Sequence, residues 1–267
     1  MATYGLSDFN CANYRKYRPL YKTDLYQELY RYHEKHGGKF VTALDIGTGT
    51  GQVAVALSAK FLQVHAIDPS SKMLEAAESR DNIHYSFGQG EDLSQFESGT
   101  IDIITVSEAF HWLDHSKFFQ EIRRVMASQA TLMVIGYTNP TIIEYPEASR
   151  KLQAHEERIA PLHEKGRKHL ASLYRGIDIP FADVRRSYYH PADPQSILRS
   201  EMNVDELRNF MKTYGSYKIY CSKYPHEPDV VDAVIESIVS SEQLKDDDRF
   251  TVSWNTVVIF AQGHLLS

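Results

Sequence analysis

Residues 44–51 read Leu-Asp-Ile-Gly-Thr-Gly-Thr-Gly and combine a carboxylate with glycine at every second position. Glycine adopts backbone angles that are closed to other residues and lets a ligand approach the main chain without an intervening Cβ. An apolar run precedes this stretch, and apolar residues at helical spacing follow it over 53–61. The pattern predicts a strand, a ligand-binding loop and a helix, with the loop contacts made by Gly47, Thr48, Gly49 and Gly51.

A second carboxylate, Asp68, ends the next expected strand, where it can accept both hydroxyls of a ribose. Two nucleoside cofactors compete for this arrangement, because residues 49–54 and Asp68 also fit the looser dinucleotide pattern G-x-G-x-x-G/A. Asp45 would face a pyrophosphate badly but suits an ammonium group. S-adenosylmethionine carries an ammonium and no phosphate, so Asp45 favours it over a nicotinamide dinucleotide. A glycine turn that serves only packing is the third alternative.

The elements around these residues alternate between short apolar runs and helical patterns from about 39 to 137, which predicts βαβ units and a parallel sheet. Ser70 or Ser71 and then Asp114 are expected to cap two of the helices. The expected strands are 40–45, 64–68, 83–86, 101–106, 131–137, 184–189 and 250–261, and the further helical segments are 12–36, 144–175, 203–213 and 229–244.

This rhythm predicts one structural domain with a doubly wound α/β sheet and added helices. The expected parts are N-terminal lid helices at 1–38, a cofactor-binding core at 39–140, 181–190 and 249–267, and helical cap insertions at 141–180 and 191–248.

The composition is that of an ordinary globular protein, with 267 residues, 42% hydrophobic residues and a net charge of −6. The acidic balance argues against nucleic acid as a partner, since phosphate-binding surfaces are normally basic. Only two cysteines occur, and no apolar stretch or leader-like N-terminus suggests a membrane segment. We expect a cytoplasmic monomer or homodimer that does not bind membranes.

The cofactor residues carry a family resemblance. Asp45-x-Gly47-x-Gly49-x-Gly51 resembles the first motif of class I S-adenosylmethionine-dependent methyltransferases, and Asp68 resembles the acid of their second motif. Residues 90–93 (Gly-Glu-Asp-Leu) resemble the segment that cups adenine; the resemblance implies that Asp92 accepts from the adenine amino group and that the backbone at Glu91 meets the ring. Residues 108–114 resemble the stretch after strand four in the small-molecule branch, which places Ser107 beside the methionine part.

The resemblance extends to the trans-aconitate methyltransferase-like (methyltransferase type 11) group. Its N-terminal segment is matched by Tyr14-x-x-Tyr17-Arg18-Pro19-x-Tyr21, its cap motif by 210–216 and its last strand by 252–255. The cap departs from the group's Thr-Trp-Ser, because Thr213-Tyr214-Gly215 stands there. The resemblance implies a Rossmann-like sheet of seven strands, of which the last is antiparallel. It also implies methylation of a small organic molecule, and a carboxylate oxygen is the favoured acceptor.

His111 is the candidate catalytic base, and the favoured alternative is that it anchors its loop or touches the adenosine end of the cofactor. A carboxylate acceptor would need no base, whereas a hydroxyl or amine acceptor usually would. Trp112 is expected to form a wall of the substrate pocket, with a cation–π contact as the alternative. A catalytically silent binding protein is a further possibility.

Tyr14, Tyr17 and Tyr21 are spaced to share one face of a helix, either as a packing stripe or as a lid. In the lid, Tyr14 or Tyr17 would meet the carboxylate end of the cofactor. Arg18 would hold that carboxylate or an acidic substrate, and Tyr21 and Tyr214 would line the substrate pocket. Residues 150–186 carry nine basic against five acidic residues, which indicates a solvated helix face or a cap that attracts an acid. His155, His163 and His169 lack metal-site spacing, and we expect no metal.

Overall fold

The computed structural model describes residues 9–265 and divides into two compact units. Unit 1 comprises residues 1–21, 138–167 and 189–256, and unit 2 comprises 22–137, 168–188 and 257–267. The ends of the expected lid and core segments, 1–8 and 266–267, lie outside the described residues. The elements in chain order are α1 (Cys11–Tyr17), α2 (Thr23–Lys35), β1 (Thr42–Ile46), α3 (Gln52–Ser58), β2 (Gln63–Asp68), α4 (Ser71–Glu75), β3 (Ile83–Phe87), β4 (Ile101–Ser107), η2 (Phe110–Trp112), α5 (His115–Val125), β5 (Met126–Ile142), α6 (Pro146–Ile159), η3 (Ala160–Leu162), α7 (Arg167–Ala171), β6 (Phe181–Tyr189), β7 (Arg199–Met202), α8 (Val204–Met211), α9 (Gly215–Lys223), α10 (Val230–Glu242) and β8 (Phe250–Leu265).

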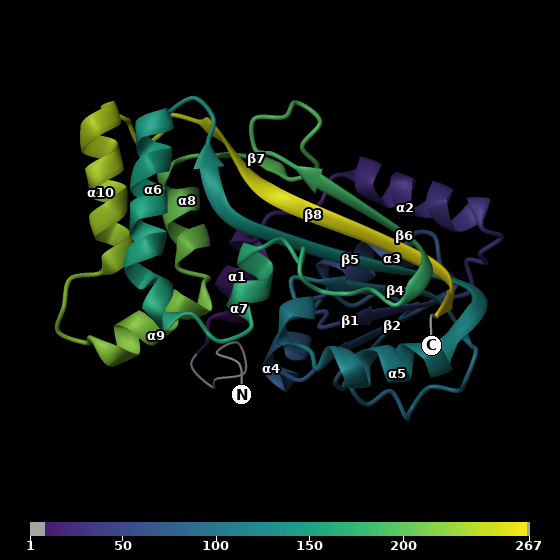
Figure 1. Ribbon diagram of the computed structural model, residues 1–267. Helices are drawn as coiled ribbons and strands as arrows, with labels where there is room; N and C mark the ends of the chain where they lie inside the picture. The colour runs from purple at the N-terminus through teal and green to yellow at the C-terminus, as the bar shows by residue number, and fades with distance from the viewer. Residues whose placement is uncertain (1–8, 266–267) are drawn as a thin grey trace. The chain divides into compact units, whose positions relative to one another are not determined.

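The strands form one sheet in the order β3-β2-β1-β4-β5-β8-β6. Strand β1 pairs in parallel with β2 on one side and with β4 on the other, so the strand order reverses direction between β1 and β4. Figure 1 shows β8 running opposite to β5. The predicted doubly wound fold is confirmed, with an eighth strand, β7, that the sequence pattern did not predict and that pairs antiparallel with β8.

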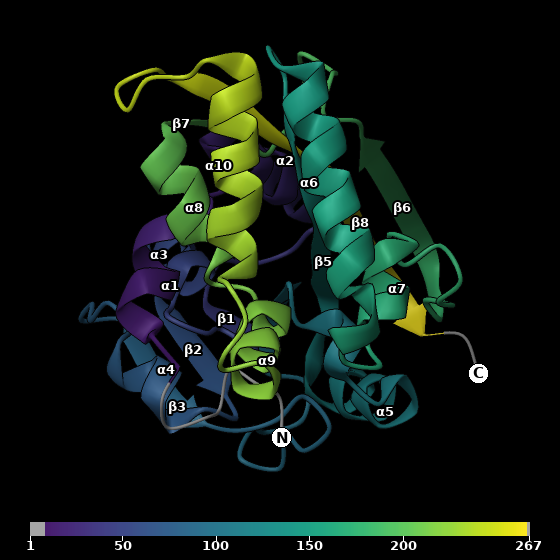
Figure 2. The ribbon, with the colours of Figure 1, turned by 90° about the vertical axis from the view of Figure 1, so that its left-hand side faces the viewer.

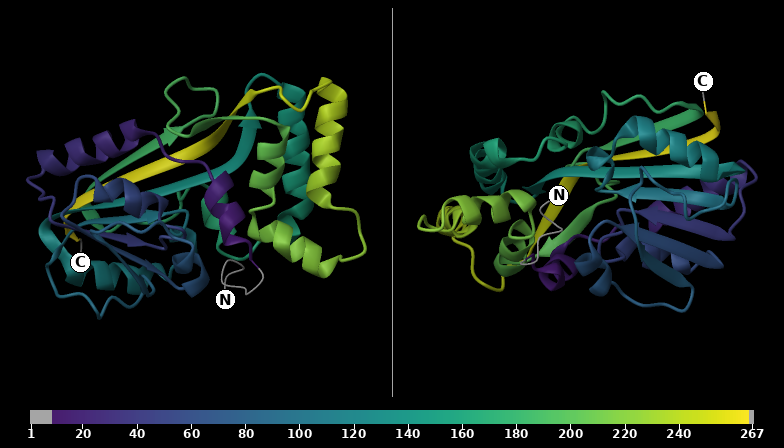
Figure 3. Two further views of the ribbon diagram at one scale, coloured as in Figure 1. Left: turned by 180° about the vertical axis from the view of Figure 1, so that it is seen from behind. Right: turned by 90° about the horizontal axis from the view of Figure 1, so that it is seen from below.

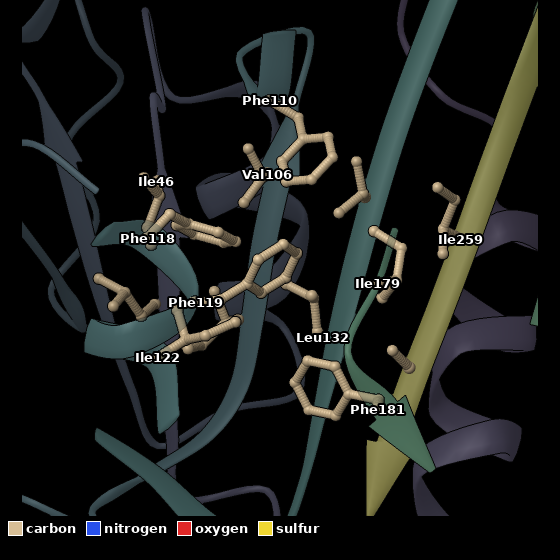
Figure 4. Packing of buried hydrophobic residues seen from close by; sticks show 14 of the residues in the cluster. Ile46, Val106, Phe110, Phe118, Phe119, Ile122, Leu132, Ile179, Phe181 and Ile259 are labelled. Atoms are coloured by element: carbon tan, nitrogen blue, oxygen red, sulfur yellow. The ribbon is translucent and has the colours of Figure 1, made fainter. Parts of the chain in front are cut away.

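The sheet of unit 2 is buried because its central strands are apolar on both faces. All residues of β4 except Ser107 are buried, as a strand covered on two sides requires. Figures 1 and 3 show α2 and α5 on opposite faces of these strands. In the core, Phe118 and Phe119 of α5 gather with Val106 of β4 (Figure 4).

Two predicted helix caps are confirmed. The hydroxyl of Ser70 accepts from the backbone N–H of Met73 at 3.3 Å at the start of α4. A carboxylate oxygen of Asp114 accepts from the N–H of Ser116 at 3.1 Å at the start of α5. These caps begin helices directly after the sheet edge at which β1, β2 and β4 end, so they hold short loops at that edge.

The expected helix over 12–36 is wrong in one respect, because the chain forms two helices there. Helix α1 ends at Tyr17, and Arg18 is extended with ψ of 136°. A residue before proline is driven out of the helical region, and Pro19 follows Arg18. Tyr21 therefore lies beyond the end of α1. The prediction that Tyr21 shares one helix face with Tyr14 and Tyr17 is wrong.

Unit 1 is built mainly from helices. Figure 2 shows α10 between α6 and α8, and α10 packs against both of them. Helix α1 packs against α8. Helix α9 was not predicted; it buries only Gly215 and Tyr220, so its sequence lacks the apolar stripe that would reveal it.

A buried histidine joins α2 to the start of the sheet in unit 2. His33 is 0% exposed, and its Nε2 lies 2.8 Å from the carbonyl oxygen of Lys39. A carbonyl only accepts, so Nε2 carries the proton, and Nδ1 accepts from the Thr131 hydroxyl at 2.9 Å. Burial lowers the pKa of His33 below its ordinary value. The native state thus holds this imidazole neutral.

This histidine should make the protein less stable in acid. Because the pKa of His33 is lower in the folded state, its contribution is fully present above about pH 6.5 and is lost as the pH falls through the folded pKa. Urea unfolding between about pH 5 and pH 8 should show a smaller acid loss in His33→Gln than in the wild type. His84→Gln, at an exposed position, is the control and should keep the wild-type slope. Equal slopes in all three proteins would contradict the assignment.

Candidate functional site

The glycine loop between β1 and α3 has a backbone that only glycine adopts freely. Gly47, Gly49 and Gly51 all have positive φ, at 67°, 58° and 86°. A Cβ on Gly47 would lie 2.4 Å from the Cβ of Ala109, and one on Gly51 would lie 2.3 Å from the hydroxyl of Tyr85. The loop therefore needs these glycines for its conformation and for close packing.

The loop is docked onto the end of strand β2. The backbone N–H groups of Gly47 and Thr48 donate to the carbonyl of Ile67, at 2.9 and 3.0 Å. The N–H of Gly49 donates to a carboxylate oxygen of Asp68 at 2.9 Å. The other oxygen of Asp68 accepts from the N–H of Ser70 at 2.8 Å. Asp68 thus positions the loop, and each of its oxygens retains acceptor capacity for a hydroxyl.

Asp45 lies at the end of β1 and is buried, at 1% exposed. Its two carboxylate oxygens accept from the hydroxyls of Thr48 and Thr105, each at 2.6 Å. Burial raises the pKa of Asp45 to about 6, although these two hydrogen bonds oppose the rise; the charge of Asp68 adds to it. Burial likewise raises the pKa of Asp68. The loop therefore holds two carboxylates whose ionised forms a nearby cation would stabilise.

Sequence reasoning missed one hydrogen-bond partner of Asp45 and a tyrosine whose pKa depends on its charge. Thr105 stands opposite Asp45 in the β1–β4 register, and the signal was a polar residue inside the apolar run of β4. Burial raises the pKa of Tyr26 in α2, and the charge of Asp45 raises it further.

The predicted adenine segment follows β3 and approaches the glycine loop. A Cβ on Gly90 would lie 3.0 Å from Ile46, the residue before Gly47. Glu91 accepts from the N–H of Asp114 at 2.8 Å, so its side chain ties this segment to the start of α5. Asp92 is exposed, and hydrogen bonds from Ser94 lower its pKa. An exposed, ionised carboxylate at this place is able to accept from a ligand.

The end of β4 reaches the same loop. The hydroxyl oxygen of Ser107 is buried and has no hydrogen-bond partner among the described residues. Glu108 follows with φ of 54° and accepts from the N–H of Tyr137 at 2.6 Å. This left-handed turn, rare for a residue other than glycine, is followed by Ala109, which lies against Gly47. Sequence reasoning did not single out Glu108.

His111 and Trp112 lie in η2, directly after this turn. The His111 ring is buried, at 6% exposed, and is adjacent to the half-buried Trp112 ring, with centroids 4.4 Å apart. Its Nδ1 lies 3.0 Å from the hydroxyl of Tyr174, a residue that sequence reasoning did not identify.

The predicted aromatic residues of unit 1 are partly brought together. Arg18 is 8% exposed, and its guanidinium lies over the rings of Tyr14 and Tyr214, at 4.8 and 5.0 Å. Its Nε donates to the hydroxyl of Thr213 at 2.9 Å. Tyr17 instead lies under Lys16, at 4.8 Å, and Tyr21 is half-buried beyond the end of α1.

Several basic residues between 150 and 186 have partners within their own unit. Arg167 donates to Glu156 at 3.3 Å, and Arg186 donates to the carbonyls of Tyr174 and Ile177 at 3.0 and 2.7 Å. These hydrogen bonds stabilise the local structure around Arg167 and Arg186. Within residues 9–265 no group of His, Cys, Asp and Glu side chains could hold a metal ion. No helix in that range is long and apolar enough to cross a bilayer.

The residues present fit a nucleoside that is positively charged and free of phosphate. The glycine loop leaves room at the main chain, two buried carboxylates flank it, and the buried hydroxyl of Ser107 faces no described partner. A pyrophosphate beside Asp45 and Asp68 would meet like charge.

Comparisons with known proteins agree with this fit. The family model described as a methyltransferase domain matches residues 44–134. A probable S-adenosylmethionine-dependent methyltransferase of Saccharomyces cerevisiae, CRG1, is 27% identical over 95% of this chain and 96% of its own length. A methyltransferase of Dictyostelium discoideum is 24% identical over 91% of this chain and 88% of its own.

The same fold is found in a solved structure described as a type II methyltransferase from Anaeromyxobacter dehalogenans. It superposes with a TM-score of 0.73 at 20% identity and covers 94% of this chain and 99% of that one. The family match settles the choice of cofactor that the glycine pattern left open between two nucleosides. This chain therefore carries a methyltransferase domain, and its activity is that of an S-adenosylmethionine-dependent methyltransferase.

Proposed function

We propose that this methyltransferase transfers the methyl group to a carboxylate oxygen of a small organic acid. The cofactor supplies a methyl group on a positively charged sulfur, which is the electrophile of the reaction. The protein must then bind, orient and dehydrate the acceptor. A carboxylate is already anionic and requires no proton removal, so the protein's task with such an acceptor is positioning.

The cofactor residues proposed here are those gathered at the ends of β1, β2 and β4 and in the loop after β3. Asp45 favours the ammonium group through its buried charge, and Asp68 accepts from the ribose hydroxyls. Asp92 and the backbone at Glu91 meet the adenine, and Ser107 borders the methionine part. The main chain of the loop is contributed by Gly47, Thr48, Gly49 and Gly51. From unit 1, Tyr14, Tyr17 and Arg18 are proposed to meet the carboxylate end.

The observation that supports an acidic acceptor is the concentration of positive charge around one ring in unit 1. The guanidinium groups of Arg18 and Arg167 lie over the same Tyr214 ring, at 5.0 and 6.0 Å. The protein as a whole carries a net charge of −6, and Glu156 pairs with Arg167 at 3.3 Å, so an acidic acceptor at this ring would be held chiefly by Arg18. Paired guanidiniums beside an aromatic wall suit a planar carboxylate. Trp112, Tyr21 and Tyr214 are the proposed walls of the acceptor site.

The second candidate function is methylation of a hydroxyl or amine with His111 as the base. The observation that favours it is the position of His111, a buried imidazole two residues beyond the contact between Ala109 and Gly47.

One experiment separates these acceptors. The protein is incubated with a cell extract and S-adenosylmethionine labelled in its methyl group, and the labelled products are then treated with mild alkali. A methyl ester hydrolyses and releases labelled methanol, whereas a methyl ether or N-methyl amine does not. We expect most of the label to appear as methanol. Label that remains fixed to the product would overturn the carboxylate proposal in favour of the hydroxyl or amine.

The buried carboxylate at 45 should make cofactor binding depend on pH. A cation favours ionised Asp45, whose pKa is raised to about 6, so affinity for S-adenosylmethionine should fall about tenfold per unit below about pH 6. Without cofactor, the raised pKa of Asp45 has the opposite effect on stability, because the folded protein is then favoured in acid. The contribution of Asp45 to stability is complete below about pH 4 and is lost as the pH rises through about 6.

Titration calorimetry and urea unfolding between about pH 4.5 and pH 8 measure both effects. Asp45→Asn, which cannot ionise, should bind the cofactor weakly at every pH and be more stable than the wild type at neutral pH without cofactor. A wild-type affinity that stays constant across this range would show that Asp45 does not interact with the bound cation.

The helical segments 141–180 and 191–248 serve as the cap over the acceptor, with the N-terminal helices within 1–38 as the lid. The protein acts in the cytoplasm as a monomer or homodimer, with neither nucleic acid nor membrane as partner.

A further inference from the structure

Tyr174 is fully buried, and its ring is closely surrounded by other residues. Its ring is 0% exposed and meets the Phe110 ring edge-on, with centroids 5.3 Å apart. A Cβ on Gly136 of β5 would lie 2.6 Å from the Tyr174 ring, so glycine makes room for it. The hydroxyl of this enclosed ring lies 3.0 Å from Nδ1 of His111.

Tyr174 has a strained backbone conformation, which hydrogen bonds from and to neighbouring residues maintain. Leu173 and Tyr174 are consecutive non-glycine residues with positive φ, at 51° and 57°. Such residues cost free energy and persist only where the surroundings determine them. The N–H of Tyr174 donates to the carbonyl of His169 at 2.9 Å, and Arg186 donates to the Tyr174 carbonyl at 3.0 Å. The turn is therefore built to place this side chain.

The chemistry of the pair decides where the imidazole proton lies. A phenol O–H is more acidic than a neutral imidazole N–H, and an imidazole nitrogen is a better acceptor than a phenol oxygen. The favoured hydrogen bond thus runs from the Tyr174 hydroxyl to Nδ1 of His111. In a neutral imidazole the proton then lies on Nε2, because the bond made by one nitrogen sets the state of the other. Nε2 is consequently a donor and not a base.

We propose that Tyr174 is a positioning residue that holds His111 as the Nε2–H tautomer, so that His111 donates a hydrogen bond to the acceptor carboxylate. This inference rests on the proposed function for its acceptor, and on the His111–Tyr174 contact for its tautomer. A donor at this site binds and orients an anion that needs no deprotonation, and it discriminates against a hydroxyl acceptor that would need a base. His111 would then contribute to acceptor recognition, and Tyr174 would act through it.

The tautomer is measured directly by nitrogen-15 NMR of the histidine rings, with His111→Gln to assign the signals. We expect Nδ1 of His111 to resonate in the unprotonated range and Nε2 in the protonated range, and Tyr174→Phe to move the two shifts toward one another. Tyr32→Phe removes another buried tyrosine hydroxyl and should leave the His111 shifts unchanged. A proton on Nδ1 in the wild type would overturn the inference, whatever the acceptor proves to be.

Two substitutions at 111 then separate donor from base. The side-chain amide of Gln places an N–H near the position of Nε2 but cannot abstract a proton. With labelled S-adenosylmethionine and the cell extract, His111→Gln should keep methanol-releasing activity within about tenfold of the wild type. His111→Ala should raise KM for the acceptor by about 10- to 100-fold.

If both variants lose kcat equally, His111 is a base and the donor role is wrong. If no labelled methanol forms with any protein, the carboxylate proposal fails, while the NMR result still decides the tautomer. The two proposals therefore fail by different observations.

Discussion

Replacing Asp68 with alanine should weaken binding of S-adenosylmethionine by about 100-fold, the equivalent of about 3 kcal/mol. The proposed role of Asp68 is to accept from two ribose hydroxyls, and a hydrogen bond to a charged group contributes about 1.5–3 kcal/mol. The same carboxylate accepts from the N–H groups of Gly49 and Ser70, so its removal also loosens the loop. Titration calorimetry at neutral pH measures the loss, and thermal unfolding verifies that the variant is folded.

Asp102 provides a matched control in the same sheet. It is exposed to the same extent as Asp68, 8%, and its carboxylate also accepts from two backbone N–H groups, those of Val41 and Thr42. It lies near the amino ends of β1 and β4, away from the glycine loop. Asp102→Ala should lose stability and keep its cofactor affinity. Equal losses of affinity in the two variants would mean that Asp68 acts only through folding.

Gly47→Ala should abolish most cofactor binding and destabilise unit 2. An L-residue in the left-handed region costs about 1–2 kcal/mol. The new Cβ would also lie 2.4 Å from the Cβ of Ala109, so either the loop or the turn after β4 must move. Movement of the loop would displace the N–H groups that dock it onto Ile67. Calorimetry and urea unfolding report the two losses separately.

Two further variants isolate the steric part of this effect. Gly99 has φ of 72°, close to that of Gly47, but a Cβ there would meet nothing within 4 Å. Gly99→Ala should therefore show the backbone cost alone and bind the cofactor normally. Adding Ala109→Gly to Gly47→Ala should restore part of the stability, because it removes the opposing methyl group. If Gly47→Ala is no worse than Gly99→Ala, the close approach to Ala109 is not a constraint.

The features that the sequence predicted correctly depend on local patterns. The glycine loop, the carboxylates at the ends of β1 and β2, and the caps Ser70 and Asp114 each follow from a few neighbouring residues. The parallel sheet follows in the same way from apolar runs that alternate with helical spacing. Pro19 is a local signal too, and its effect on Arg18 explains why Tyr21 lies off the helix.

The features that the sequence did not reveal join residues far apart in the chain. His111 and Tyr174 are separated by 63 positions, and Asp45 and Thr105 by 60. Their pairing depends on strand register and on a strained turn at Leu173 and Tyr174, neither of which has a compositional signature. Strand β7 has four residues, too few for a recognisable alternation. The candidate binding residues at the strand ends were therefore predictable, whereas the residues that hydrogen-bond to them from distant parts of the chain were not.

The most direct test of this cofactor site is a crystal structure with S-adenosylhomocysteine bound. We expect both ribose hydroxyls at hydrogen-bond distance from the carboxylate of Asp68, about 2.6–3.0 Å, with the amino-acid end of the ligand on the side of Asp45 and Thr48. A ligand whose ribose meets other residues, or whose amino group lies at the opposite end of the loop from Asp45, would contradict these roles of Asp68 and Asp45.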